Sequence, residues 1–82
     1  MEEPIGVVTH YYNRISVAVV RLHQPLSVGE FVSFVGHTTS FDQRVSSMEI
    51  NHEQIASAEA GAEIAILVED RVRKGDFILR AD

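Results

Sequence analysis

Two short segments carry the side chains best suited to bind a ligand. His10, Tyr11 and Tyr12 follow one another near the end of an expected strand, and residues 36–40 (Gly-His-Thr-Thr-Ser) form a loop rich in hydroxyl groups. Adjacent aromatic rings can stack on the bases of a single strand, or they can cap the open end of a barrel with one ring buried. Loop hydroxyls can bind a phosphate, a peptide backbone or a nucleotide edge, although they more often fix the turn through local backbone hydrogen bonds.

These two segments define the binding surface that we predict. Both end strands, and both differ from side chains that only fill a barrel. Aromatic rings would provide contact area, while histidine and threonine side chains would set the orientation of the partner. Sequence does not fix which strand ends are neighbours, so their convergence is itself part of the prediction. The predicted binding residues are His10, Tyr11, Tyr12, His37, Thr38 and Thr39.

Side chains for metal or covalent chemistry are present but poorly spaced. The chain has no cysteine, and its four histidines include no pair with the short spacing common in zinc sites. Ser47 lacks the G-x-S-x-G surroundings of a nucleophile. No G-x-x-x-x-G-K-[ST] loop is present to hold a nucleotide phosphate. We therefore predict no metal, no cofactor, no nucleotide hydrolysis and no enzymatic activity.

The charge balance is acidic, with 12 acidic residues against 7 basic ones and a formal charge of −5. This balance argues against binding to free nucleic acid, which needs clustered Lys and Arg against the phosphates. The local exception is residues 71–74 (Arg-Val-Arg-Lys), next to Glu69 and Asp70. We interpret this run as a solvated turn rather than a phosphate site, because basic patches that bind are usually larger.

The length of 82 residues fits one domain spanning residues 1–82, too small to add a catalytic domain. Absence of cysteine suits a reducing cytosol, and the acidic start Met1-Glu2-Glu3-Pro4 is unlike a signal peptide. No apolar run approaches the length that crosses a membrane. We expect a cytoplasmic protein with no membrane contact.

Alternating apolar residues predict an all-β fold with six or seven strands. The runs lie at residues 5–11, 15–22, 31–35, 44–50, 63–68 and 77–80. In the second run, Ala18, Val20 and Leu22 would share one face. Residues 52–60 (HEQIASAEA) have the only helical character and are interpreted as a long connection with one helical turn.

Glycine corners divide these runs. Val28-Gly29-Glu30 and Lys74-Gly75-Asp76 each precede a strand, and Ala60-Gly61 marks a third corner. Glycine readily takes the positive φ of a tight turn, so Gly29, Gly61 and Gly75 are predicted to be structural corners. A chain that reverses repeatedly at such corners is typical of a small antiparallel β-barrel.

Within residues 44–50 the apolar pattern slips by one position. Val45 and Met48 both suit a core but are three residues apart, whereas Met48 and Ile50 keep the period of two. One extra residue at Ser46-Ser47 would restore the register, so we predict a β-bulge there.

Taken in order, these elements resemble domain 2 of translational GTPases such as elongation factor Tu. The matching pieces are Val28-Gly29-Glu30, residues 44–48 (Arg-Val-Ser-Ser-Met), residues 60–63 (Ala-Gly-Ala-Glu) and Lys74-Gly75-Asp76. The resemblance implies a small β-barrel of the translation-factor type. The Gly-Arg turn of that domain is replaced here by residues 10–13 (His-Tyr-Tyr-Asn), so a role in holding aminoacyl-tRNA does not transfer to these residues.

Residues 10–22 and 36–52 carry a second resemblance. They are similar to a family of small stand-alone proteins described as translation-elongation-factor-like, and a related domain ends some collagenase-like peptidases. The family implies the barrel but supplies no reaction. We therefore expect a non-catalytic interaction module with a protein or ribonucleoprotein partner, in a translation context. The alternative is a protein-binding accessory module that works with a peptidase or another enzyme.

Overall fold

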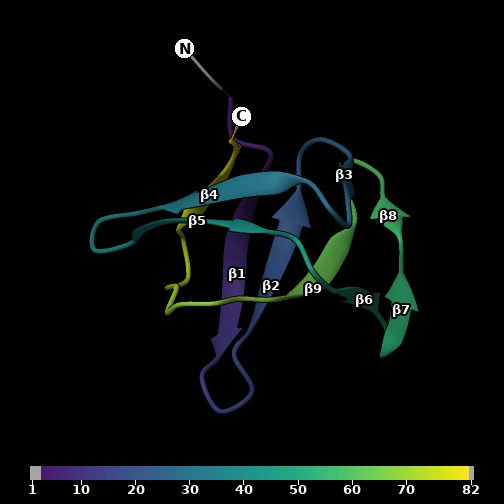
Figure 1. The fold of residues 1–82 in the computed structure, drawn as a ribbon, viewed down its shortest axis with the longest axis horizontal. Helices are drawn as coiled ribbons and strands as arrows, with labels where there is room; N and C mark the ends of the chain where they lie inside the picture. The colour runs from purple at the N-terminus through teal and green to yellow at the C-terminus, as the bar shows by residue number, and fades with distance from the viewer. Residues whose placement is uncertain (1–2, 82) are drawn as a thin grey trace.

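The computed structural model describes residues 3–81, which form ten strands and no helix (Figure 1). The strands are β1 (Gly6–Tyr12), β2 (Val17–Leu22), β3 (Leu26–Ser27), β4 (Phe31–Val35), β5 (Ser40–Arg44), β6 (Met48–Ile50), β7 (Glu53–Ile55), β8 (Ser57–Ala58), β9 (Glu63–Leu67) and β10 (Phe77–Arg80). Every pairing between them is antiparallel. The predicted all-β class is confirmed.

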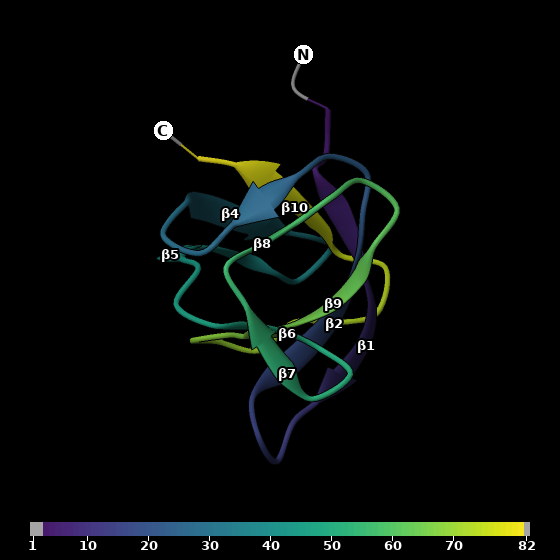
Figure 2. The same ribbon diagram turned by 90° about the vertical axis from the view of Figure 1, so that its right-hand side faces the viewer.

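Eight strands form one curled sheet in the order β5-β4-β10-β1-β2-β9-β6-β7, and β3 pairs with β8 beside it. Figures 1 and 2 show the sheet folded over on itself, so that β4 and β5 lie across β1 and β2. This is the small barrel-like architecture that the corners predicted. Among residues 3–81 there is no helix that could cross a membrane.

The core lies inside the curl and is made by the inward-facing side chains of alternating positions. Ala18, Val20 and Leu22 of β2 are all buried, as predicted, and Ile64 and Ile66 of β9 face the same interior. The side chains between them point outward and are partly buried, as Val19 and Ala65 are, or exposed, as Arg21 is. The period of two in the sequence therefore gives both the strands and the side of each strand that faces the core.

The three glycine corners are confirmed. Gly29, Gly61 and Gly75 have φ values of +99°, +92° and +96°. After each glycine, the next amide donates a hydrogen bond to the carbonyl three residues earlier, at 3.2, 3.1 and 3.0 Å. A glycine with positive φ at the third position of such a turn is typical of type II turns.

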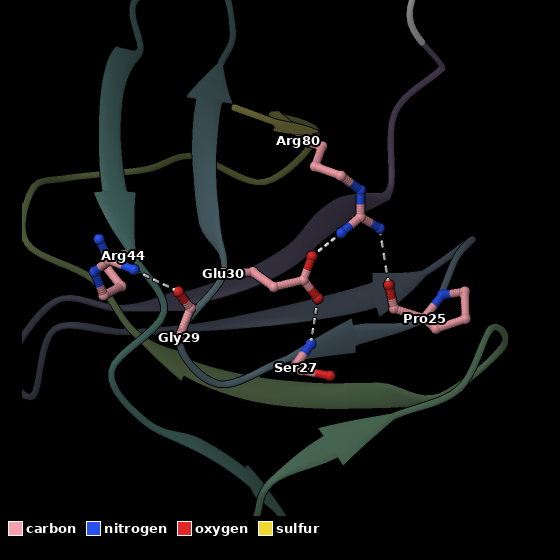
Figure 3. Close-up of polar contacts among 6 residues, drawn as sticks. All are labelled: Pro25, Ser27, Gly29, Glu30, Arg44 and Arg80. Atoms are coloured by element: carbon pink, nitrogen blue, oxygen red, sulfur yellow. Dashed lines mark hydrogen bonds and ion pairs between the residues drawn. The ribbon is translucent and has the colours of Figure 1, made fainter. Parts of the chain in front are cut away.

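Figure 3 shows how the first corner is fixed to the rest of the barrel. The Glu30 carboxylate accepts a hydrogen bond from the Ser27 amide at 2.8 Å and forms an ion pair with Arg80 of β10. Arg80 also donates to the Pro25 carbonyl at 3.1 Å, and Arg44 of β5 donates to the Gly29 carbonyl at 2.7 Å. Side chains from two other strands thus hold this corner in place.

Residues 44–50 are not one bulged strand, so the bulge predicted at Ser46-Ser47 is wrong. β5 ends at Arg44 and pairs with β4 at one edge of the sheet, whereas β6 begins at Met48 and pairs with β9 and β7 near the other edge. Residues 45–47 carry the chain between these places. Val45 is buried in this connection and Met48 is buried at the start of β6, so their spacing reflects a break between strands.

The irregularity in the sheet lies in β1 instead. Val8 is opposite Val20 and His10 is opposite Val19, so Thr9 is an extra residue between them. This insertion changes the phase of β1, and the inward positions become Val8 and then Tyr11. A bulge of this kind bends a strand and strengthens its twist.

The single helical turn expected in residues 52–60 is also wrong, because this segment contains β7 and β8. Asn51 and His52 both have positive φ, at 53° and 67°, and they join β6 to β7 as a two-residue hairpin loop. Positive φ at both central positions is the mark of a type I′ turn, which Asn favours at its first position. The helical pattern that began at His52 is therefore broken by a tight turn at its first residue.

A buried side chain helps to close the curled sheet between β5 and β9, which do not pair through their backbones. Gln43 of β5 is 2% exposed, and its amide nitrogen donates to the Leu67 carbonyl at 3.0 Å. Its amide oxygen accepts from the Glu69 amide at 2.8 Å. One glutamine thus makes the two hydrogen bonds that a neighbouring strand would make, and it joins β5 to the end of β9.

Candidate protein-binding groove

The structure separates the two segments that were predicted to form one binding surface. Residues 10–12 end β1 beside the β1–β2 turn, whereas residues 37–39 lie in the loop between β4 and β5. Figures 1 and 2 show these two connections on different sides of the molecule. Tyr12 lines one surface depression, and Thr38 and Thr39 line another. The six residues therefore belong to two places.

At the end of β1 the aromatic residues divide between the two faces of the sheet. Tyr11 packs against the core, opposite Ala18. His10 and Tyr12 point outward, with ring centroids 4.3 Å apart and planes tilted by 58°. Tyr12 is 50% exposed, so its ring can contact a partner. The bulge at Thr9 produces this division because it moves Tyr11 into the inward phase.

The outer face of β2 and β9 forms the floor of an apolar groove with a volume of about 780 Å³. Val17 lies opposite Leu67 and Val19 lies opposite Ala65, and all four side chains line the groove. Leu67 is 46% exposed. Exposed apolar side chains that adjoin one another, unlike scattered ones, commonly mark an interaction surface.

Two connections form the walls of this groove. On one side stand Tyr12 and Ile15, from the end of β1 and the following turn. On the other side stand Ile50 and the Asn51-His52 turn. Ile15 was expected in a strand, but it lies in the turn at residues 13–16 and is 62% exposed. An isoleucine at the tip of a turn contributes nothing to the core and is available for contact.

The ionisable side chains that line the groove include two acids, Glu49 and Glu63. Arg21 approaches Glu63 at 3.8 Å, with both side chains about half exposed, so it neutralises that acid only weakly. No basic side chain of residues 3–81 lines the groove except His52. The groove therefore combines an apolar floor with an acidic margin, which suits a segment carrying apolar and basic side chains.

The second depression lies between the β4–β5 loop and the link from β9 to β10, with a volume of about 320 Å³. Thr38 and Thr39 line it from the loop, Ser40 from the start of β5, and Arg71 and Arg73 from the link. Thr39 is only 5% exposed, because its hydroxyl donates to the Asp76 carboxylate. His37 is exposed and lines neither depression.

For metal binding, no three His, Cys, Asp or Glu side chains within the described part of the chain come close enough to hold an ion. The histidines lie at the end of β1, after β2, in the β4–β5 loop and in the β6–β7 turn.

Sequence reasoning did not find the groove residues Ile15 and Leu67. Both were assigned to strands as ordinary apolar positions, and only their outward direction in the folded chain makes them surface residues. A signal was present for Leu67, because residues 63–68 are apolar on both faces of the strand. Such a strand is covered on both sides or has an exposed apolar face.

Comparison with known proteins gives a relative by sequence and solved domains of similar fold. No family model matches the chain. The chain is 34% identical over 75 residues to the uncharacterized protease MJ0090 of Methanocaldococcus jannaschii, and the match covers 90% of this chain but 18% of that protein. The chain thus spans about a fifth of the length of this relative.

Among solved structures, the chain resembles the C-terminal domain of a Geobacillus thermoleovorans protein whose name assigns it to the U32 peptidases. One structure superposes with a TM-score of 0.91 at 17% identity, covering 99% of this chain and 93% of the domain. Its selenomethionine variant gives 0.89 at 17% identity, with 95% and 99% covered. This similarity shows a shared fold and agrees with the resemblance to peptidase C-terminal domains. The resemblance to elongation factor Tu stays a prediction.

Proposed function

We propose that this chain is a non-catalytic accessory domain that works with a peptidase by binding protein through the apolar groove. The observation that carries the proposal is the relative named a protease, of which this chain matches only 18%. Most of that protein must therefore lie outside the part that this chain resembles. A small domain beside a much larger protease portion fits an accessory role.

The partner that we propose for the groove is the catalytic part of such a peptidase. The groove offers adjoining apolar side chains, among which Tyr12, Ile15 and Leu67 are each about half exposed or more. Aromatic and aliphatic side chains in a desolvated centre contribute most of the energy of protein interfaces. Glu49 and Glu63 at the margin favour a contact region that carries Lys or Arg.

The position of the groove is compatible with this arrangement. Both termini lie at one end of the molecule, and the β1–β2 turn, whose Ile15 forms a wall of the groove, lies at the opposite end in Figures 1 and 2. The β1–β2 turn therefore lies away from both termini.

The test is capture of partners from native lysate by the tagged chain, followed by mass spectrometry. We expect a peptidase-family protein that resists ribonuclease treatment and is lost from Leu67→Glu. Phe77→Glu is the matched control, because Phe77 is 47% exposed on the outer face of β10 and lines neither depression. If Leu67→Glu recovered the peptidase as well as wild type does, the groove would be excluded as the binding surface. Absence of any peptidase would exclude the proposed function.

The second candidate is an interaction module in translation. Its support is the order of the corner motifs, which resembles domain 2 of elongation factor Tu. The same capture experiment separates the two candidates. Ribosomal proteins that disappear after ribonuclease treatment would favour the translation module over the peptidase accessory domain.

A further inference from the structure

The depression between the β4–β5 loop and the β9–β10 link joins two segments far apart in the sequence. One is the hydroxyl-rich segment at residues 38–40, where the loop enters β5, and the other is the basic run at residues 71–73. Asp76 holds them together, because its carboxylate accepts hydrogen bonds from the Thr39 hydroxyl and, at 2.8 Å, from the Arg73 amide. Thr39 and Asp76 are each 5% exposed, so this connection is shielded from water.

The loop approaches Asp76 so closely that only glycine fits at its first position. A Cβ atom on Gly36 would lie 1.9 Å from the Asp76 Oδ1 atom. The Gly36 amide donates to the Thr39 carbonyl at 2.8 Å and closes the loop on itself. The backbone of the loop on this side of the depression is therefore held against Asp76.

Two guanidinium groups at this depression have no acidic partner. Within residues 3–81 the ion pairs of Arg side chains are Arg21 with Glu63 and Arg80 with Glu30, and neither Arg71 nor Arg73 forms one. Both line the depression and are exposed. The acid that also lines it, Asp70, accepts a hydrogen bond from the Arg71 amide at 2.7 Å. The buried Asp76 is the other acid beside these residues, and both carboxylates already accept hydrogen bonds from a backbone amide or a hydroxyl. Among the described residues the two guanidinium groups have no such partner, and they remain available to an anion.

The remaining lining supplies neutral donors and a flat wall. Thr38 of the loop and Ser40 at the start of β5 carry hydroxyls that can donate to an oxyanion. Phe41 also lines the depression, and its ring is stacked on Phe34 of the core with centroids 5.1 Å apart and planes at 15°. This stacking fixes the Phe41 ring as a wall for an apolar group.

The sequence alone favoured a solvated turn at residues 71–74, but the structure places Arg71 and Arg73 beside a hydroxyl-rich segment. We infer that this depression binds one phosphate group carried by a small molecule, with Arg71 and Arg73 as the cationic ligands. Guanidinium groups match the oxygens of phosphate in pairs, and a dianion can engage both of them. A volume of about 320 Å³ lies at the lower end for small-molecule sites, so the group that bears the phosphate can lie against Phe41. The inference does not depend on the proposed peptidase partner, because the groove and this depression share no lining residue.

A single phosphate is favoured over a nucleic acid strand. A strand needs a row of cations along its backbone, whereas this depression offers two in a chain of net charge −5. The wider field of the protein repels a polyanion, but a small dianion interacts mainly with the two nearby guanidinium groups.

The test is to titrate each probe into the full chain, in a buffer without phosphate, and to monitor binding by the amide chemical shifts of the protein. The probes are inorganic phosphate, phenyl phosphate and acetate. We expect saturable binding of both phosphates, with shifts concentrated at residues 38–41 and 70–73, and tighter binding of phenyl phosphate. Arg71→Gln and Arg73→Gln should each weaken binding by about tenfold, as expected for loss of a charged hydrogen bond.

Arg14→Gln is the matched control. Arg14 lies in the β1–β2 turn, is exposed, and has no ion pair within the described residues, so its substitution removes the same charge elsewhere. Binding by Arg14→Gln should equal that of wild type, and thermal melting should show all three variants folded. Equal weakening by all three variants, or acetate bound as tightly as phosphate, would overturn the assignment. Tighter binding of a short RNA than of phenyl phosphate would replace the small molecule with a nucleic acid.

Discussion

The corners at residues 27–30 and 73–76 have the same local structure but different surroundings. In each, a glycine with positive φ precedes an acid, whose carboxylate accepts the amide hydrogen of the residue three positions earlier at 2.8 Å. The longer Glu30 side chain reaches outward to Arg80 and stays 31% exposed, as Figure 3 shows. The shorter Asp76 is 5% exposed and holds Thr39 of a distant loop.

A third corner shows what the acid adds. At residues 59–62 the glycine turn closes with a backbone hydrogen bond of 3.1 Å, but Ala62 stands where the acid would be. The turn therefore needs the glycine and not the carboxylate. In the other two corners the carboxylate adds a connection to another part of the barrel, and burial decides how strong that connection is.

The largest effect is expected from removing the buried acid. Asp76→Ala should lower the free energy of unfolding by about 3 kcal/mol, because two hydrogen bonds to a charged group are lost in a buried place. Glu30→Ala should cost about 1 kcal/mol, since its ion pair is partly exposed. Urea denaturation of both variants measures the difference. Equal losses would show that burial does not distinguish the corners.

A methyl group on Gly36 should break the Asp76 corner alone. Gly36→Ala should cost about 2 kcal/mol, because the added Cβ atom overlaps a carboxylate that two hydrogen bonds hold in place. In the Asp76→Ala background the same substitution should cost much less, since the overlapping group is gone. This double-mutant cycle is measured by denaturation, and additive costs would contradict the close contact.

The glycines themselves should be equivalent at the three corners. Gly29→Val, Gly61→Val and Gly75→Val should each cost about 1–3 kcal/mol through backbone strain at positive φ. Open space surrounds each position, with no atom within 4 Å of an added Cβ, so packing differences do not contribute. Thermal melting gives the comparison. Unchanged melting of Gly75→Val would show that its conformation is not required.

The smallest expected effect is the response to salt. Adding about 1 M NaCl shortens the screening length to about 3 Å, which should reduce the cost of Glu30→Gln because that ion pair is partly exposed. The cost of Asp76→Asn should stay unchanged, since its partners are a hydroxyl and an amide in a buried place. Denaturation at low and high salt provides the measurement. Salt dependence of the Asp76→Asn cost would mean that the site is open to solvent.

Local pattern was enough to predict the corners and six of the strands, but β3, β5, β7 and β8 were missed, so the expected six or seven strands became ten. Gly29, Gly61 and Gly75 could be assigned because positive φ is a property of a single residue. The inward face of β2 followed from the period of two. The prediction failed at residues 44–50 because a slip in register and a break between two strands leave the same pattern. It failed at residues 52–60 because the Asn51-His52 turn was not recognised as a hairpin loop.

Which residues share a surface was decided by the folded chain. From the sequence, His10 and Thr38 looked equally suited to one site, but the strand order places them in separate regions. Arg71 and Thr38 are 33 positions apart along the chain, yet they line the same depression. Contacts of this kind depend on sheet order and on the phase set by the bulge at Thr9. Both arise from pairings between distant strands, which no local window of sequence contains.

The sequence by itself determined the all-β class, the three glycine corners and the acidic charge of this chain, because each depends on single residues or on short periodic runs. Only the tertiary structure decided that Glu30 is a surface residue while Asp76 is a buried link. Only the tertiary structure, too, decided that Leu67 and its neighbours form an apolar groove on the surface. The physical reason is that burial and charge pairing depend on what the rest of the barrel places around a residue. Two turns with the same local structure can therefore differ in the burial and the distant partners of their acids.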